Sequence, residues 1–322
     1  MSKIVVLDDV YLTKNHIEKL QKLGDVRIFK DNPSSEEETL QRLGDTEIAI
    51  VGWTNITETI IQKLPKLRMI SVWATGYDYI DLKAATKNGI VVTNVPAYAS
   101  ESVAEHVFAL ILSVIRQIPQ ADKHVREGGY DWKQFQGIEL AGKVLGVIGT
   151  GAIGRRVAEI GKCLGMKVIA VTAHPSKERA QKLGVKYVDF DTLLRESDVI
   201  SVNVPLTSET DRLFNEEAFD KMKHSAIFVN TSRGKVVDES ALYKALANGK
   251  LGGAGLDVLI GPIDKHHPLF QLSNVVFTPH TGFYTNEALC RCTDICLENV
   301  ECFLKASPRN VVNPGVLGRA GS

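Results

Sequence analysis

Arg233, Asp257 and His280 are side chains suited to chemistry, and each follows closely on an apolar run that is typical of a strand. A guanidinium can hold a planar carboxylate through two parallel hydrogen bonds. An imidazole can give and take a proton near neutral pH, and a carboxylate can accept hydrogen bonds from an amide. Each also has an ordinary alternative: a surface arginine, a loop-capping aspartate or a structural histidine. Because open α/β sheets place their sites on the loops after strands, the three together predict a catalytic site for a carboxylic acid.

A glycine turn near the middle of the chain is the strongest single motif. The run 149–154, Gly-Thr-Gly-Ala-Ile-Gly, follows an apolar strand pattern over 144–148 and precedes a helical pattern over 155–164. The first glycine allows the tight turn, the second lets the backbone approach a pyrophosphate, and the third lets the helix pack close to the strand. The helix adds unpaired N–H groups and its positive dipole end. The pattern predicts a dinucleotide-binding site.

The choice between NAD and NADP depends on the end of the next predicted strand. NAD-binding units usually carry an acidic residue there for the ribose 2′-hydroxyl, whereas this chain has Thr172. His174, Lys177 and Arg179 follow and could attract a 2′-phosphate, so the pattern favours NADP; the alternative is that these are solvated residues and NAD is accepted too. The predicted cofactor-binding residues are Gly149, Gly151, Ala152, Ile153, Gly154, Thr172, His174, Pro205, Thr231, Asp257 and Gly282.

The composition is that of an ordinary globular chain and argues against several other classes of protein. Lys plus Arg and Asp plus Glu number 38 each, so no net charge recruits nucleic acid or an anionic membrane. The longest apolar stretch, 107–115, is about half as long as a membrane span, and the first apolar run is too short for a signal peptide. The expected compartment is the cytoplasm. Five cysteines with no Cys-x-x-Cys pair predict packed thiols, without disulfides or a metal site.

Short apolar runs alternate with helical patterns along the chain, which indicates parallel sheets covered by helices on both faces. The predicted fold class is α/β, with two Rossmann-like or flavodoxin-like domains and a cleft between them. We expect residues 1–96 and 288–322 to form the substrate (catalytic) domain and residues 97–287 to form the dinucleotide-binding domain. A long apolar helix is expected from Ser100 to Ile118. The predicted strands are Ile4–Leu7, Val26–Phe29, Ile48–Val51, Met69–Val72, Ile90–Val92, Val144–Ile148, Val168–Val171, Val199–Val202, Ile227–Val229, Gly253–Leu256 and Val275–Phe277.

Six motifs, taken in order, resemble the D-isomer-specific 2-hydroxyacid dehydrogenase family over essentially the whole chain. They are Ala74–Asp78, Ser102–Glu105, the glycine turn, Asn230–Gly234, Gly255–Val258 and Thr278–Gly282. The resemblance is closest to glyoxylate and hydroxypyruvate reductases. It implies a catalytic domain built from both chain ends, a central nucleotide domain, a homodimer, and an Asp257 that contacts the nicotinamide amide.

The resemblance also implies roles for individual residues. Arg233 would bind the substrate carboxylate, and His280 would be the acid–base catalyst. Backbone N–H groups near Thr75 and Gly76 would hold the carboxylate as well. Apart from the resemblance, Trp53 follows a predicted strand of the first domain, so it could face the cleft and limit the size of the substrate there; the alternative is that it packs in the core.

One loop departs from the family's pattern. The family carries a glutamate shortly after the Asp-Val pair, where it hydrogen-bonds the catalytic histidine, and Gly261 stands at that place here. Without a carboxylate partner, His280 would lose an orienting hydrogen bond and a stabiliser of its charged form. We expect either that Asp264 or a neighbouring loop carboxylate takes over, or that the activity is weak or the substrate unusual. The pair His266–His267 lacks ligand spacing and is expected to be solvated loop.

The sequence therefore predicts the NAD(P)H-dependent reduction of a small 2-oxo acid to the D-2-hydroxy acid. A D-lactate-type dehydrogenase is one alternative, because residues 281–285 resemble the corresponding stretch of those enzymes. The other is a nucleotide-sensing protein with little turnover, similar to the corepressors that share this scaffold. The missing glutamate favours the sensor, whereas Arg233 and His280 favour the enzyme.

Overall fold

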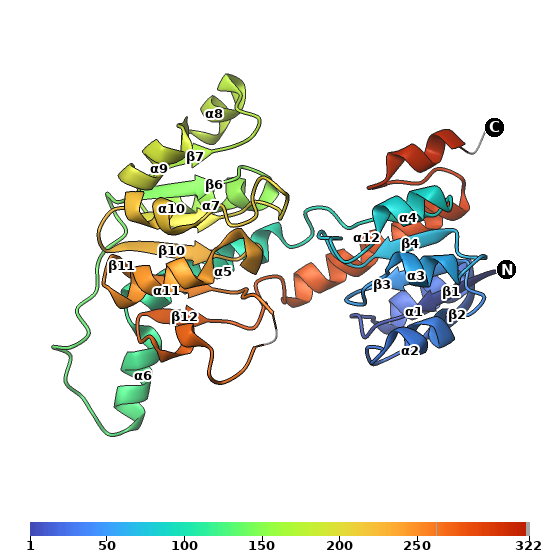
Figure 1. Cartoon of the computed structure of the whole chain (residues 1–322), viewed down its shortest axis with the longest axis horizontal. Helices are drawn as coiled ribbons and strands as arrows, with labels where there is room; N and C mark the ends of the chain where they lie inside the picture. Colours follow the sequence, from blue (N-terminus) through green and yellow to red (C-terminus); the bar gives the residue numbers. More distant parts are fainter. Residues whose placement is uncertain (262, 320–322) are drawn as a thin grey trace. The chain divides into compact units, whose positions relative to one another are not determined.

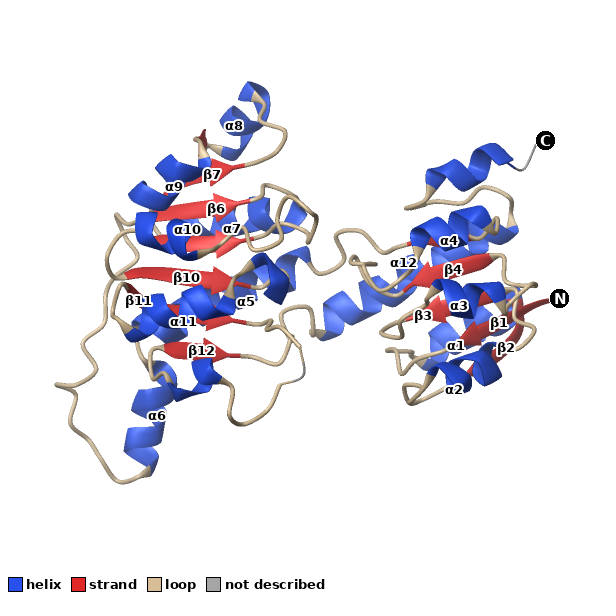
Figure 2. Ribbon diagram, viewed as in Figure 1, coloured by secondary structure: helices blue, strands red, loops and turns tan. Residues whose placement is uncertain are grey.

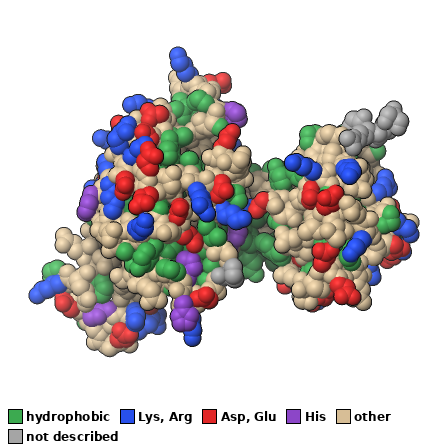
Figure 3. Space-filling view, in the orientation of Figure 1, with side chains coloured by type: hydrophobic (Ala, Val, Ile, Leu, Met, Phe, Trp, Pro, Cys, Tyr) green, Lys and Arg blue, Asp and Glu red, His purple; other side chains and the backbone are tan. Residues whose placement is uncertain are grey.

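The computed structural model describes residues 1–261 and 263–319 of the chain. The chain divides into two compact units: a first unit of Met1–Tyr98 with the segment from Thr285 onward, and a second unit of Ala99–Tyr284. Each unit is built on one parallel sheet with helices packed against it (Figures 1 and 2). The predicted α/β class with two parallel sheets is therefore confirmed. Basic and acidic side chains are interspersed on the visible face (Figure 3), as their equal numbers lead one to expect.

The first unit holds a five-stranded sheet of order β2-β1-β3-β4-β5. Every residue of β3 and β4 is buried, because a sheet covered on both faces needs apolar side chains on both sides. The order reverses between β1 and β3, which places the ends of those two strands at the switch point. The elements of this unit are β1 (Ser2–Val6), α1 (Lys14–Leu23), β2 (Gly24–Ile28), α2 (Glu36–Leu43), β3 (Ile48–Val51), α3 (Glu58–Gln62), β4 (Met69–Val72), α4 (Leu82–Lys87), β5 (Val91–Thr93), α12 (Asn286–Leu304) and the 3₁₀ helix η3 (Pro314–Arg319).

Helix α12 belongs to the first unit although it comes almost 200 residues after β5. Trp73, just after β4, donates from Nε1 to Thr293 Oγ1 at 3.0 Å. Cys292 and Cys296 are buried on the same helix, and burial raises the pKa of both thiols, that of Cys296 to about 12. These two thiols therefore stay protonated and act as small apolar groups.

The second unit holds a seven-stranded sheet of order β12-β11-β10-β9-β6-β7-β8. Alternate residues of a strand face opposite sides, so Ile227 and Val229 pack in the core beside α5 and α7, while Phe228 packs in the core beside α10 and α11. The elements are α5 (Ser100–Ile115), α6 (Ile118–Arg126), β6 (Val144–Ile148), α7 (Ala152–Cys163), β7 (Lys167–Val171), α8 (Lys177–Leu183), β8 (Lys186–Tyr187), α9 (Phe190–Glu196), β9 (Val199–Val202), α10 (Glu216–Lys221), β10 (Ala226–Asn230), η1 (Gly234–Val236), α11 (Glu239–Ala247), β11 (Leu251–Leu256), η2 (Pro268–Gln271) and β12 (Val275–Phe277).

The helix predicted over roughly Ser100 to Ile118 is confirmed as α5, which ends three residues earlier, and a second helix, α6, follows that was not predicted. Helix α5 ends at Ile115, Gln117 adopts the left-handed region at φ 50°, and α6 continues at an angle of 59°. The apolar pattern stops at this break, and no residue of α6 is buried. Within the described residues no single helix is long and apolar enough to cross a membrane, and only α5 and α6 taken together across the bend reach that length and composition.

Candidate active site

Arg233, Asp257 and His280 lie at the carboxyl edge of the second sheet, after the neighbouring strands β10, β11 and β12. Hydrogen bonds continue from one strand end to the next beyond the sheet. Asp257 N donates to Asn230 O at 3.0 Å, and His280 N donates to Asp257 O at 2.9 Å. The three loops predicted to carry the chemistry are therefore tied together at one edge of one rigid sheet.

Asn230, the last residue of β10, shapes the loop that carries Arg233. Its side chain is buried, and its Oδ1 accepts hydrogen bonds from Ser232 N at 3.0 Å and from Ser232 Oγ at 2.8 Å. Its Nδ2 donates to Arg233 O at 2.9 Å, and Arg233 Nη1 donates to Ser232 O at 2.9 Å. The backbone on both sides of Thr231 is thereby fixed.

Asp257 organises the turn that carries His280. The carboxylate is 2% exposed; its Oδ1 accepts from Thr278 Oγ1 at 2.6 Å and Thr281 N at 2.8 Å, and its Oδ2 accepts from Gly282 N at 3.0 Å. Burial acts to raise the pKa of Asp257, but the hydrogen bonds that it accepts outweigh burial and hold the pKa below its usual value. The loop-capping role is therefore seen directly, and the contact with a nicotinamide amide stays a prediction.

His106, on α5, completes this cluster, and nothing in the sequence analysis pointed to it. Its Nε2 lies 2.8 Å from Thr278 Oγ1 and 3.3 Å from Asp257 Oδ1. Helix α5 comes this close because β11 is rich in glycine: a Cβ added at Gly255 would lie 2.8 Å from Leu110 Cβ. The only signal for His106 in the sequence is a titratable residue inside a largely apolar helix.

His280 itself has a left-handed backbone, with φ at 55°. Its N–H is shared between Asp257 O and Thr278 O, and its ring meets Phe283 edge-to-face at 5.9 Å. A non-glycine residue in this region carries strain of about 1–3 kcal/mol and keeps it only where the surroundings over-determine the conformation. The Asp257 hydrogen bonds to both sides of His280 supply that constraint.

A cavity of about 490 Å³ opens beside His280, and most of its lining is apolar. Among the described residues that line it, Asp257 carries the only carboxylate. Asp264, predicted as a substitute for the missing glutamate, is exposed and does not line the cavity; its Oδ1 accepts from His266 N at 2.6 Å. Gly261 takes φ 74°, and Pro262 lies outside the described residues. The lining consists of Asp257, Val258, Leu259, Ile263, Phe270, Phe277, Thr278, Pro279 and His280.

Glu239, the first residue of α11, anchors the loop that follows Asp257. Its Oε1 accepts from Ile260 N at 2.7 Å, and its Oε2 lies 3.2 Å from His267 Nε2. The expectation that His267 is solvated is therefore wrong, because its side chain is only 14% exposed and is paired with Glu239. A Cβ at Gly234 would lie 2.5 Å from Leu259 O, so this loop packs directly on the residue after Arg233.

The glycine turn has the geometry that a dinucleotide needs. Gly149 takes φ 88°, and a Cβ there would lie 2.6 Å from Asn203 O. Helix α7 has Gly151 as its N-cap without a side-chain hydrogen bond, and open space surrounds the Cβ position of Gly151. Asn203 Oδ1, in the loop facing this turn, is buried and has no hydrogen-bond partner among the described residues. A helix N-terminus without a side-chain cap, open space and an orphaned buried acceptor at the β6–β9 switch point all fit a bound dinucleotide.

The other predicted cofactor residues lie on the same edge of the second sheet. Ala152 and Ile153 open α7, Pro205 follows β9, and Thr172 and His174 follow β7. Residues 172–176 contain no carboxylate. Ser176 caps α8, whose first turn carries Lys177, Glu178 and Arg179. Arg179 lines a cavity of about 370 Å³ together with Arg155 and Lys182, and the carboxylates of Glu101 and Glu159 line the same cavity.

In the first unit, the predicted substrate residues follow β3 and β4. Thr75 donates from Oγ1 to Val95 O at 2.7 Å, and Gly76 is half-buried beside it. Trp53 is 41% exposed and meets Trp73 edge-to-face at 5.9 Å, so it does not belong to the core. What these residues bind stays a prediction.

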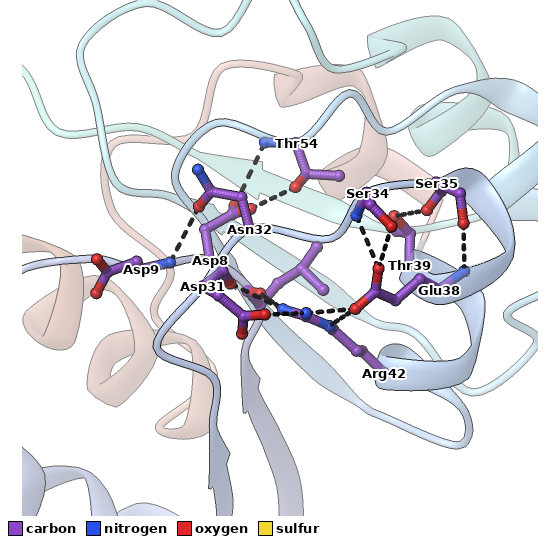
Figure 4. A network of polar contacts seen from close by, with 11 residues as sticks. Asp8, Asp9, Asp31, Asn32, Ser34, Ser35, Glu38, Thr39, Arg42 and Thr54 are labelled. Carbon is purple, nitrogen blue, oxygen red and sulfur yellow. Dashed lines mark hydrogen bonds and ion pairs between the residues drawn. The ribbon is translucent and has the colours of Figure 1, made fainter.

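The loop that carries Trp53 is held by Asp8, a fully buried carboxylate after β1 that was not predicted. Asp8 Oδ2 accepts from the N–H groups of Gly52 at 2.6 Å, Trp53 at 3.0 Å and Thr54 at 3.4 Å. Oδ1 accepts from the Thr54 hydroxyl, and Figure 4 shows both contacts of Thr54. The neighbouring polar network in Figure 4 centres on Arg42, which is 6% exposed and pairs with Asp31 and Glu38.

Comparison with known proteins agrees with this geometry. A family model described as "D-isomer specific 2-hydroxyacid dehydrogenase, NAD binding domain" matches residues 108–282. The chain belongs to the D-isomer-specific 2-hydroxyacid dehydrogenase family. It is therefore an NAD(P)-dependent oxidoreductase of that family, as predicted from the six motifs.

Three similar proteins illustrate the range of the family. D-3-phosphoglycerate dehydrogenase of Archaeoglobus fulgidus is 44% identical over 94% of this chain, which spans only 56% of that protein's length. Glyoxylate reductase of Korarchaeum cryptofilum is 39% identical over 94% of this chain and 93% of its own. The solved structure of an acyclic imino acid reductase in complex with NADPH and D-Arg is 39% identical, with a TM-score of 0.90 over 96% of this chain and 99% of that one.

Proposed function

We propose that this protein reduces small 2-oxo acids of the glyoxylate and hydroxypyruvate type to the D-2-hydroxy acid, with NADPH preferred over NADH. The observation that carries the proposal is the row of Arg233, Asp257 and His280 on the sheet edge that also carries the glycine turn. The similarity to a glyoxylate reductase along nearly the whole of both chains supports it. The substrate, the NADP preference and the homodimer are predictions.

Arg233 and His280 take the two roles that the reaction needs. Arg233 offers two parallel N–H groups to the substrate carboxylate, and the buried Asn230 holds its loop in place before the substrate arrives. His280 donates a hydrogen bond to the carbonyl oxygen and passes its proton there as negative charge develops. The nicotinamide, when bound, supplies the hydride for the carbonyl carbon.

The preference for NADPH rests on charge at the end of β7. Thr172 lacks the carboxylate that would repel a 2′-phosphate, and Lys177 and Arg179 stand in the first turn of α8. Lys177 and Arg179 attract the phosphate, although Glu178 between them offsets part of their charge, and Thr172 in place of an acidic residue removes a repulsion. Comparing kcat/KM for NADPH and NADH tests this preference; a strong preference for NADH would contradict it.

The decisive experiment is a panel of 2-oxo acids with both coenzymes, run on the wild type, Arg233→Ala and Arg233→Lys. Loss of two charge-assisted hydrogen bonds, each worth about 1.5–3 kcal/mol, should lower kcat/KM of Arg233→Ala by about 10²- to 10⁴-fold. Arg233→Lys keeps the charge and should recover part of the loss. Coenzyme affinity should stay within about twofold in both variants, because Arg233 does not lie in the glycine turn. Tight coenzyme binding without any turnover across the panel would favour the nucleotide sensor.

A second substrate class, 2-imino acids, has two observations in its favour. Gly261 stands where the family carries the glutamate partner of its catalytic histidine, and an acyclic imino acid reductase is among the similar structures. A protonated imine already carries the proton that a ketone must receive, so its reduction demands less of a general acid. Adding an amine to the 2-oxo acid assay tests this class: faster coenzyme oxidation with an amino acid as product supports it, and an unchanged rate rejects it.

A further inference from the structure

The hydrogen bonds between α5 and the His280 turn have a definite direction. Asp257, held as an anion, can only accept. The Thr278 hydroxyl has one hydrogen, and its Oγ1 lies 2.6 Å from Asp257 Oδ1, so that hydrogen goes to the carboxylate. Thr278 Oγ1 must therefore accept from His106 Nε2, which lies 2.8 Å away. His106 is thus the donor at the head of a chain that runs from Nε2–H to Thr278 and on to Asp257, and the same Nε2 also lies 3.3 Å from Asp257 Oδ1.

This chain ends on the backbone around His280. Asp257 accepts N–H groups from the two residues that follow His280, and its main-chain oxygen accepts the N–H of His280 itself. The orientation of the Asp257 carboxylate therefore fixes a turn that contains a strained, left-handed His280. Thr278, two residues before His280, donates its hydroxyl to Asp257 Oδ1, the oxygen that also accepts from Thr281 N.

We propose that His106 is a positioning residue for His280. Its N–H holds the Thr278 hydroxyl in place, and that hydroxyl in turn holds Asp257 Oδ1. The carboxylate is thereby kept in the orientation that accepts the N–H groups of Thr281 and Gly282. This inference rests on the proposed function, because it assigns His106 an effect on the proton donor of that reaction. The side chain of His106 is not among the residues that line the cavity beside His280, so His106 has no direct part in the chemistry.

The competing explanation is that His106 only fills space between α5 and the turn. A Cβ at Gly282 would lie 3.3 Å from His106 Cδ2, so the ring does pack there. A leucine would keep that packing and remove the N–H donor, whereas a glutamine can offer an N–H near the place of Nε2. Comparing His106→Leu with His106→Gln therefore distinguishes a role in filling the space between α5 and the turn from a role as hydrogen-bond donor.

The first experiment compares steady-state kinetics of the wild type, His106→Leu and His106→Gln. Removing one hydrogen bond that orients the proton donor should lower kcat of His106→Leu about tenfold, with KM and coenzyme affinity within about twofold. His106→Gln should recover most of kcat. Equal kcat in the leucine variant and the wild type would overturn the inference, and so would a loss that glutamine does not restore.

A double-mutant cycle with Thr278→Val tests whether the two residues act through one chain. If they do, His106→Leu and Thr278→Val each lower kcat, and the double variant is no worse than the worse single variant. Multiplying effects would mean that His106 and Thr278 act independently and would overturn the inference. Melting temperatures of all variants show whether the fold is intact.

The last readout does not depend on turnover. The imidazole resonances of His280, assigned by comparison with His280→Asn, should be sharp in the wild type, broadened or shifted in His106→Leu, and restored in His106→Gln. If the wild type reduces no substrate but these spectra change as expected, the proposed function fails and the positioning role stands. If the enzyme is active and the His280 resonances are the same in all three proteins, the positioning role fails.

Discussion

Asp8 in the first unit and Asp257 in the second are the same structural device used twice. Both are buried carboxylates: Asp8 lies two residues after β1, and Asp257 lies directly after β11. Asp8 holds the loop after the neighbouring strand β3, and Asp257 holds the loop after the neighbouring strand β12. Asp8 accepts three backbone N–H groups and the hydroxyl of Thr54. Asp257 accepts two backbone N–H groups and the hydroxyl of Thr278.

The two sites differ in what else touches the carboxylate and in what the loop presents. Asp257 has His106 Nε2 at 3.3 Å, and its loop carries the titratable His280. The hydrogen bonds of Asp8 among the described residues all come from residues 52–54, and its loop carries Trp53. A buried carboxylate can thus fix a loop in either unit. Of the two, within the part of the chain that the structure describes, only Asp257 is hydrogen-bonded to histidines, through His106 Nε2 and the backbone of His280.

The largest expected effect comes from Asp257→Asn. An amide presents N–H groups toward the N–H of Thr281 or Gly282, so the turn must rearrange and His280 must leave its position. We expect kcat to fall by about 10²-fold or more, in line with the loss of a preorganised donor. Steady-state kinetics on a 2-oxo acid substrate measure this effect.

Asp8→Asn is the matched control, because it makes the same change in the other unit. If the comparison holds, kcat of Asp8→Asn stays within about threefold of the wild type, while its stability falls. A kcat loss in Asp8→Asn as large as that in Asp257→Asn would remove the distinction between the two sites.

The second effect is on stability of the first unit. In Asp8→Asn, the amide oxygen can take the place of Oδ2 and still accept from the 52–54 loop, and the Thr54 hydroxyl turns to accept from the new NH₂ group. The hydrogen bonds lose their charge assistance, so we expect a loss of about 1–2 kcal/mol. Trp53 and Trp73 both lie in the first unit, and Trp132 is the third tryptophan of the chain. Urea unfolding followed by tryptophan fluorescence in a Trp132→Phe background therefore reports on the first unit alone, where Asp257→Asn should change little.

The positions of Arg233, Asp257 and His280 after their strands could be predicted from the sequence because they are local features; their roles stay predictions. Arg233, Asp257 and His280 each follow a strand, and successive parallel strands end at one edge of a sheet, so no long-range information is needed to bring the loops together. The glycine turn is local for the same reason.

The residues that were missed depend on packing between distant segments. His106 reaches Asp257, 151 positions later in the chain, only because α5 packs on a glycine-rich β11. Asp8 reaches residues 52–54 only because β1 and β3 are neighbours at the switch point. The break at Gln117 was missed because the apolar pattern of α5 runs up to it, and a single left-handed residue has no clear signature in composition.

A smaller effect is expected from the threonines that support each carboxylate. Thr54→Val removes the hydroxyl that Asp8 accepts and should lower the stability of the first unit by about 1 kcal/mol, with kcat unchanged. Thr54→Ser, which keeps the hydroxyl, should behave like the wild type. If Thr54→Val instead lowers kcat as Thr278→Val is expected to do, the loop of residues 52–54 contributes to the reaction itself and not only to the size of substrate that Trp53 admits.

The smallest expected effect is the change with pH in the contribution of Asp257 to stability. The pKa of Asp257 in the folded protein lies below its usual value of 3.8, because its hydrogen bonds outweigh burial. A carboxylate of this kind stabilises the fold at pH values above its unfolded pKa, and the contribution is lost as the pH falls through the folded pKa. The difference in urea midpoint between the wild type and Asp257→Asn should therefore be constant from pH 7 to about pH 5 and shrink below about pH 4. Asp264→Asn, which removes an exposed carboxylate on the same sheet edge, controls for net charge. A difference that grows as the pH falls would mean that the folded pKa is raised, and that Asp257 does not hold its turn as an anion.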